Sequence, residues 1–133
     1  MTALVSVVMP VRNGGAWLGD AASSILKQTH AQLELIIVDD HSDDDALQKL
    51  DKSDSRLTIL QSAGIGVSAA FNTGMNAARG EFIARMDADD LALPGRIHEQ
   101  LEYLVQNPDV DICGGKVEIF SEHGLEGGNL RYQ

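Results

Sequence analysis

The 133-residue sequence is poor in basic residues, in cysteine and in long apolar stretches. Only 10 Lys and Arg stand against 20 Asp and Glu, a net charge of −10, so the chain has no basic face to neutralise a nucleic-acid backbone. The single cysteine, Cys113, excludes an intramolecular disulfide, indicates a reducing compartment and is expected to be a small buried strand residue. No stretch approaches the ~20 apolar residues of a transmembrane segment, and the first residues lack the basic start of a signal peptide. We therefore expect a cytoplasmic protein, with peripheral association at the inner face of a membrane left open.

What remains is enough for one core, because 44% of the residues are hydrophobic. Apolar runs typical of strands buried on both faces alternate with segments of helical periodicity. The predicted strands are 4–10, 33–39, 56–61, 80–87, 110–115 and 116–120; the predicted helices are 16–29, 45–53, 67–79 and 94–107, with Pro94 in the first turn of the last. This alternation predicts an α/β fold with a mostly parallel central sheet covered by helices on both faces. Residues 1–133 are expected to form a single domain.

Aspartates gather where the predicted strands end. The strand at 33–39 runs into "DDHSDDD", the strand at 80–87 runs into "DADD", and the first strand is followed by "VRN". In an open parallel sheet, ligands bind outside the carboxyl ends of the strands. The sequence therefore places five aspartates at one edge: Asp39, Asp40, Asp87, Asp89 and Asp90.

Several aspartates of the "DDHSDDD" stretch also have a purely structural interpretation. Asp43, Asp44 and Asp45 are expected to be the N-cap and first-turn charges of the short helix at 45–53. Asp39 and Asp40 can be ligand-binding residues or turn formers. The pattern alone leaves these two roles open.

A signalling receiver domain is one class of protein that uses such an acidic edge. The stretch "LIIVDDH" resembles the strand that opens a receiver, and Asp87 follows at a spacing that suits a phospho-accepting aspartate. However, a complete strand and helix precede this stretch, and too few residues follow Asp87 for the remaining strand–helix units of a receiver. The receiver is therefore the alternative interpretation.

Four motifs resemble another family in both order and spacing. They are "VSVVMPVRN", "LELIIVDDHSDD", "GIGVSAAFNTGMNAARGEFIARMDADD" and "LPGRI", and the resemblance runs from Val5 to about Gly115. The sequence is similar to the nucleotide-sugar domain of family 2 inverting glycosyltransferases, which have the GT-A fold, a Rossmann-like three-layer α/β/α sandwich. The resemblance implies transfer of a sugar, with inversion, from a UDP- or GDP-linked donor to a polysaccharide or glycolipid acceptor. A binding module that keeps the fold but has lost turnover is a third possibility.

The resemblance also implies a metal site. Transfer from a nucleoside-diphosphate sugar requires stabilisation of the departing diphosphate, which Mg²⁺ or Mn²⁺ held by carboxylates supplies. By resemblance, Asp89 is the direct ligand, and Asp87 lies near both metal and ribose, with Ala88 between them. Asp90 is expected to cap or orient the "LALPGR" segment that follows.

For the nucleotide, the resemblance assigns Asp39 to the base and Asp40 to the support of its loop. The backbone of Pro10 and Val11 is expected to line the pocket for base and ribose. The remaining implied contacts are Arg12 and Asn13, which complete that turn, and Asn72, which lies on the helix whose start faces the nucleotide.

Some positions depart from the family pattern, among them Arg12, His41 and the segment "QSAGIG", which lacks the asparagine often found near Ala63, and one catalytic group is missing. Arg12 stands where an aromatic residue is frequent, and His41 where a small residue, often glycine, is common. The general base that deprotonates the acceptor is expected beyond Gln133, because Glu118, Glu122 and Glu126 are poor candidates. The chain is thus expected to be the donor-binding part of a longer enzyme, with little or no activity by itself. Oligomeric state, donor and acceptor are left open.

Overall fold

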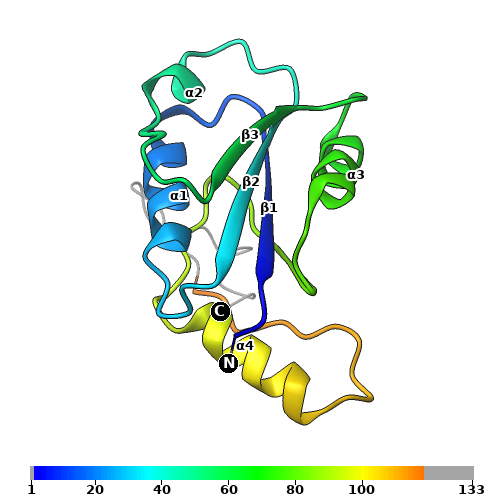
Figure 1. Cartoon of the computed structure of the whole chain (residues 1–133). Helices are drawn as coiled ribbons and strands as arrows, with labels where there is room; N and C mark the ends of the chain where they lie inside the picture. Colours follow the sequence, from blue (N-terminus) through cyan, green and yellow to red (C-terminus); the bar gives the residue numbers. More distant parts are fainter. Residues whose placement is uncertain (1, 119–133) are drawn as a thin grey trace, which may run out of the picture.

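The structure, a computed structural model, describes residues 2–118, in which a parallel sheet lies between helices (Figure 1). The strands are β1 (Val5–Val11), β2 (Leu33–Asp39), β3 (Leu57–Gln61) and β4 (Phe82–Arg85). The helices are α1 (Leu18–Leu26), α2 (Ala46–Lys49), α3 (Val67–Ala77) and α4 (Arg96–Gln106), and a short 3₁₀ helix, η1 (Gly15–Trp17), precedes α1. None of the described helices is long and apolar enough to cross a membrane.

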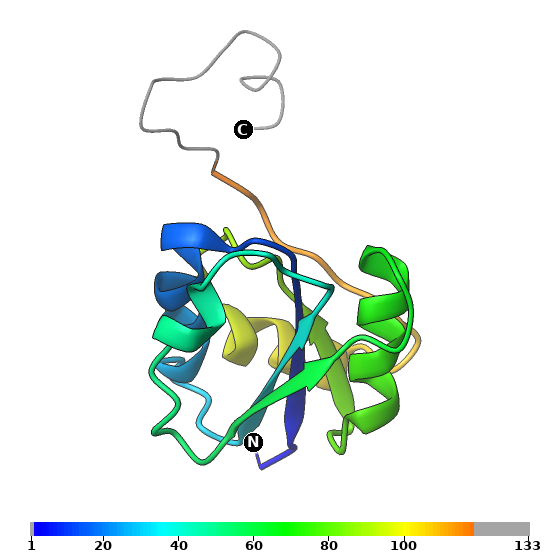
Figure 2. The same cartoon turned by 90° about the horizontal axis from the view of Figure 1, so that it is seen from above.

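The order of the strands is β3-β2-β1-β4, and all pairs are parallel. The chain moves outward from β1 through β2 to β3, and α3 then leads to β4 on the other side of β1. Strand β1 is therefore central, and its seven residues are all buried. Viewed from above, α1 and α3 lie on opposite sides of the sheet (Figure 2), which agrees with the predicted α/β/α layers.

Pro10 lies inside this central strand without loss of a hydrogen bond. Alternate residues of β1 face its two neighbours: Val11 O accepts from Asp40 N at 2.8 Å on the β2 side, and Val8 O accepts from Met86 N at 3.2 Å on the β4 side. The nitrogen of Pro10 faces the β4 side beyond Val8 and Arg85, the last pair of that ladder. A proline, which has no N–H, fits here because β4 has already ended.

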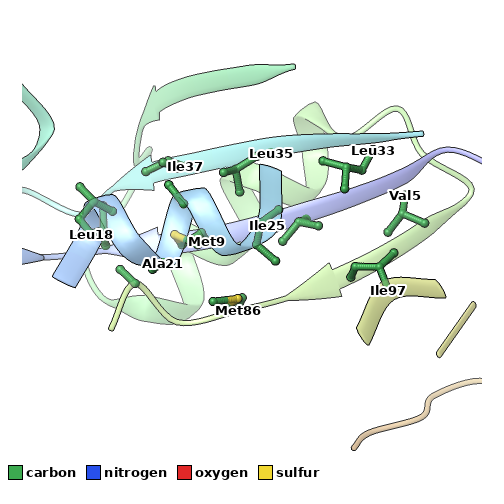
Figure 3. Close-up of a cluster of buried hydrophobic side chains, with 14 of the residues drawn as sticks. Val5, Met9, Leu18, Ala21, Ile25, Leu33, Leu35, Ile37, Met86 and Ile97 are labelled. Carbon is green, nitrogen blue, oxygen red and sulfur yellow. The ribbon is translucent and has the colours of Figure 1, made fainter. Parts of the chain in front are cut away.

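The sheet carries a separate apolar cluster on each face. The larger cluster joins β1 and β2 to α1 and α4, and Figure 3 shows Leu18 near one end of it and Ile97 near the other. The smaller cluster joins Val8, Ile36 and Val38 to Ala70 of α3. Burial on both faces explains why β1 and β2 are continuous apolar runs.

The strands predicted at 110–115 and 116–120 are wrong as far as they are described. Residues 111–118 form neither helix nor strand, and residues 119 and 120 lie outside the described part of the chain. Ile112 is 88% exposed and Val117 66%, and none of the four described strands pairs with this segment. Without a hydrogen-bonding neighbour, β-branched residues alone do not make a strand. Cys113 is accordingly only partly buried, with its Sγ 3.8 Å from Gln100 O.

The start of the last helix also differs from the prediction. Helix α4 begins at Arg96, with Gly95 at the N-cap position, so Pro94 precedes the helix and does not belong to its first turn. The backbone carbonyl of Pro94 instead accepts a hydrogen bond from Thr29 N at 2.9 Å.

Candidate functional site

The carboxyl ends of β1 and β4 meet where the order of the strands reverses. The chain after β4 stays beside β1 for one more residue, Met86, before the aspartates begin. On the other side of β1, Val11 pairs with Asp39 of β2. Crevices at such reversals are the usual ligand sites of open parallel sheets. The residues predicted from the ends of β1, β2 and β4 thus lie on the edge where a ligand is expected.

Three aspartates form a cluster directly after β4. Each of Asp87, Asp89 and Asp90 offers a carboxylate oxygen within 4.8 Å of those of the other two, and all three side chains are exposed. Between them, Ala88 is buried in the larger apolar cluster. A small apolar residue in this position anchors the loop while its neighbours face solvent. The structure thus brings together Asp87 and Asp89, which were predicted as metal ligands, and adds Asp90.

The cluster suits a hard divalent cation. Carboxylate oxygens are the ligands that Mg²⁺ and Mn²⁺ prefer, and three of them within reach of one point can share an ion. The pKa of Asp90 is raised by its partial burial and by the negative charges of Asp89 and Asp87, against the opposing effect of Arg96. Mutual repulsion of this kind is what a bound cation relieves.

Two arginines that sequence reasoning missed lie beside the cluster. Arg85 Nη2 is 3.7 Å from Asp87 Oδ1, and the Arg85 guanidinium lies 5.4 Å from the centre of the Phe71 ring. Arg96 Nη2 donates to the backbone carbonyl of Arg85 at 2.9 Å, and burial lowers the pKa of Arg96. The signal for Arg85 was its position two residues before Asp87, because alternate residues of a strand share a face.

The acidic pair at the end of β2 divides into a half-buried and a fully buried member. Asp39 is half-buried; its Oδ1 accepts from Ser42 N at 3.0 Å, and its backbone carbonyl accepts from Ser62 N at 2.9 Å. Asp40 is buried, and its Oδ1 accepts from Gly66 N at 3.1 Å. Asp40 therefore supports the turn that begins α3, while Asp39 stays at the open edge.

Asn13 joins the loop after β1 to the loop after β2. Its Oδ1 accepts from Asp43 N at 2.7 Å and from Asp44 N at 3.2 Å, and its own N–H donates to Ser42 Oγ at 2.9 Å. Its backbone has a φ of 54°, a left-handed conformation that asparagine tolerates better than most residues. We refer to these contacts as the Asn13 bridge.

The aspartates after His41 lie at the start of α2 as predicted, but none of them is in its first turn. Asp45 is at the N-cap of α2 without a side-chain capping bond. Asp44 contacts both loops, since its Oδ1 accepts from Ala46 N at 3.3 Å and its Oδ2 from Gly15 N at 2.9 Å. Asp44 therefore supports the start of α2 and also reinforces the Asn13 bridge.

The remaining predicted positions make fewer contacts with the other residues of the predicted site. Pro10 and Val11 are buried in β1, and Arg12 is exposed at its end. Asn72 is exposed on α3, and among the described residues no hydrogen bond joins it to the other predicted site residues. His41 has a φ of 59°, which explains why glycine suits this position, and its Nε2 lies 3.0 Å from Gly64 O.

Comparison with known proteins identifies relatives over nearly the whole chain. The family model described as Glycosyl transferase family 2 matches residues 6–132. The UDP-Glc:alpha-D-GlcNAc-diphosphoundecaprenol beta-1,3-glucosyltransferase WfgD of Escherichia coli is 35% identical over 93% of this chain and 49% of its own length. The chain spans 38%, 49% and 42% of three such curated relatives. These matches give no support to the receiver alternative.

Solved structures show the same fold. The S. aureus protein TarS, residues 1–349 in complex with UDP, has a TM-score of 0.70 at 24% identity, covering 78% of this chain and 32% of TarS 1–349. The mannosyltransferase PcManGT of Pyrobaculum calidifontis, in complex with GDP-Man and Mn²⁺, has a TM-score of 0.67 at 26% identity, covering 75% of this chain and 32% of its own.

Proposed function

The chain belongs to glycosyl transferase family 2, and on this premise we propose that it binds the nucleoside-diphosphate sugar of a metal-assisted, inverting sugar transfer. The observation that carries the proposal is the cluster of Asp87, Asp89 and Asp90 at the reversal point of the sheet. An acidic protein can bind an acidic donor only with positive charge between them, and this cluster is where a cation can be held.

In this proposal Asp87 and Asp89 are the metal ligands, and Asp90 completes the set. When bound, Mg²⁺ or Mn²⁺ supplies the positive charge that stabilises the departing diphosphate. Arg85 lies beside Asp87 and limits how far the uncompensated acids repel each other. The Arg85 guanidinium is also proposed to add positive charge for the phosphates of the donor.

Asp39 is proposed to bind the base of the nucleotide. Its Oδ1 is used by Ser42 N, and its Oδ2 accepts no hydrogen bond from the described residues, so an acceptor is left for a ring N–H. The other proposed contacts come from the turn after β1 and from α3, namely Pro10, Val11, Arg12, Asn13 and Asn72, with Ala88 beside the metal ligands.

The acceptor side is proposed to lie outside the described residues. We infer that the chain is the donor-binding part of a longer transferase whose general base is not among residues 1–133, which agrees with the limited share of the relatives that it spans. A polysaccharide or glycolipid acceptor, used in the cytoplasm at the inner face of the membrane, fits a relative whose name includes a diphosphoundecaprenol-linked sugar.

The test is a calorimetric titration of UDP, GDP and their sugars with and without Mn²⁺. The parent chain is expected to bind one nucleotide class more tightly when Mn²⁺ is present, and Asp89→Ala is expected to lose about tenfold or more of this gain. Asp109→Ala, which changes an exposed aspartate on the turn after α4, is the matched control and should behave as the parent.

If the parent chain binds no nucleotide either with or without Mn²⁺, the proposal is wrong. Stable labelling of Asp87 by acetyl phosphate would favour the receiver. A third outcome is tested by supplying the chain with the remainder of a transferase and its acceptor. If the donor then binds without turnover, the result would favour a binding module.

A further inference from the structure

The acidic loop, residues 86–95 between β4 and α4, begins with Met86 and Ala88 buried in the larger apolar cluster and has little apolar contact after them. Leu91 is 53% exposed and Leu93 is 79% exposed, while the smaller Ala92 only packs at the edge of the larger apolar cluster. Apolar burial therefore contributes little to the position of residues 91–95, the second half of the loop. The position of this second half depends on hydrogen bonds to its backbone.

Gln28, which follows α1, supplies one of these hydrogen bonds from a buried position and makes another to the helix that follows the loop. Its side-chain Nε2 donates to Leu93 O at 2.7 Å and to Ser24 O at 3.0 Å. Its Oε1 accepts from the buried N–H of Ile97 at 3.0 Å, in the first turn of α4. One carboxamide thus holds the end of the acidic loop and the start of the helix that follows it.

Two neighbours of Gln28 extend the contact along the same loop. Ser24 Oγ accepts from Ala92 N at 3.0 Å and donates to Ala21 O at 2.7 Å. The N–H and the hydroxyl of Thr29 both approach Pro94 O, at 2.9 and 3.2 Å. Three consecutive residues of the loop, 92–94, therefore each present a backbone group to the end of α1.

The other end of the loop is held by a side chain of α4. Arg96 Nη2 donates to Arg85 O, at the last residue of β4, and its Nε donates to Gln100 Oε1 at 3.2 Å. Because Gln28 fixes the first turn of α4, it also fixes the backbone from which Arg96 reaches back to β4. The aspartates lie between these two attachments.

Three close carboxylates repel one another, so the loop that carries them needs an external restraint to keep them together before a cation binds. We propose that Gln28, assisted by Ser24, is a positioning residue that holds the acidic loop so that Asp87, Asp89 and Asp90 can share one divalent cation. This inference rests on the proposed function, since it concerns the same cluster.

The experiment compares three variants with the parent. Gln28→Met keeps the length of the side chain without its hydrogen bonds, and Ser24→Ala removes the acceptor for Ala92 N. Ser23→Ala is the matched control, because Ser23 is a half-buried serine of the same helix whose hydroxyl makes no hydrogen bond to the described residues. Ser24→Thr restores the hydroxyl and is the rescue variant.

The readout is the Kd for Mn²⁺, measured by electron paramagnetic resonance with saturating UDP or GDP, well below the thermal midpoint of each variant. Gln28→Met is expected to raise this Kd about tenfold, as loss of an outer partner of metal ligands commonly does, and Ser24→Ala several-fold. Ser23→Ala and Ser24→Thr should match the parent.

If Gln28 has only a structural role, Gln28→Met will have a lower thermal midpoint and an unchanged Kd for Mn²⁺. That result overturns the inference. If Gln28→Met does not fold, the comparison of Ser24→Ala with Ser23→Ala decides by the same criterion. Failure of the parent to bind Mn²⁺ overturns the proposed function and this inference together. Parent-like Mn²⁺ binding by Gln28→Met and Ser24→Ala overturns this inference alone.

Discussion

The buried carboxylate of Asp40 accepts a hydrogen bond from the backbone N–H of Gly66 at 3.1 Å. This contact joins the end of β2 to the residue that precedes α3, where the φ of 96° requires glycine. A second contact, from Asp40 N to Val11 O, holds the same residue to β1. Asp40 therefore fixes three segments at the carboxyl edge of the sheet.

Asp40→Ala is expected to lower the free energy of unfolding by about 1–3 kcal/mol, because it leaves the N–H of Gly66 without its acceptor. Asp40→Asn keeps an acceptor oxygen and should lose less. Urea denaturation measures both. The control is Asp43→Ala, at an exposed side chain, and equal losses in the control and in Asp40→Ala would contradict this role.

Removal of the side-chain contacts of the Asn13 bridge should lower the free energy of unfolding. Glycine adopts a φ of 54° without strain, so Asn13→Gly loses only the side-chain acceptor of two N–H groups. The expected loss of unfolding free energy is about 0.5–1.5 kcal/mol per hydrogen bond. Asn13→Ala adds the strain of a left-handed alanine, about 1 kcal/mol more. Urea unfolding gives the difference, and a glycine variant as stable as the parent would refute the bridge.

Two glycines in helices should respond to alanine in opposite directions. A Cβ added at Gly74 of α3 meets the Val8 side chain and lies 3.1 Å from Val38 Cγ2, so Gly74→Ala should destabilise the fold by about 1–3 kcal/mol. At Gly19 of α1 nothing lies within 4 Å, and Gly19→Ala should stabilise by about 0.5–1 kcal/mol. Thermal midpoints that rise in both variants would show that α3 does not pack as described.

The pair of Asp54 and Arg56 predicts a particular response to acid. Arg56 donates to Asp54 through Nε at 3.1 Å and Nη2 at 2.9 Å, which lowers the pKa of Asp54 from 3.8 to about 2. Because the folded pKa is the lower one, the unfolded chain binds more protons between these values. The stability that the pair contributes is therefore present above pH 3.8 and is lost as pH falls toward about 2.

Asp54→Asn should remove this part of the pH dependence. Unfolding by urea, measured from pH 6 to pH 2, should show the parent losing its advantage over the variant within that window. Asp109→Asn controls for the general effect of one fewer carboxylate. A constant difference between parent and Asp54→Asn at every pH would contradict the prediction.

The parts of the fold that follow from local pattern were predictable from the sequence. Strand β2 was predicted at 33–39 and observed at Leu33–Asp39, because burial on both faces leaves an unmistakable apolar run. The acidic edge followed from the strand ends, since parallel strands all finish on one side. By contrast, the apolar residues at 110–115 needed a neighbouring strand, and no local signal reports whether a neighbour exists.

The contacts that organise the site could not be read from local pattern. Gln28 and Ile97 are 69 positions apart, and Asn13 and Asp43 are 30 apart. Glutamine at the end of a helix is ordinarily an exposed residue, and only the folded chain shows its carboxamide turned inward. The role of Asp44 was missed for the same reason, because its partner Gly15 belongs to a different loop.

The Asn13 bridge also bears on how this site can be exchanged between relatives. The turn after β1 and the turn after β2 hold each other through backbone groups of one and side chains of the other. A chimera with a crossover between residues 15 and 42 combines a turn from one parent with a turn from another, and the two no longer match. A chimera should therefore acquire the donor preference of a parent only when both turns come from that parent, so residues 10–45 have to be exchanged as one unit.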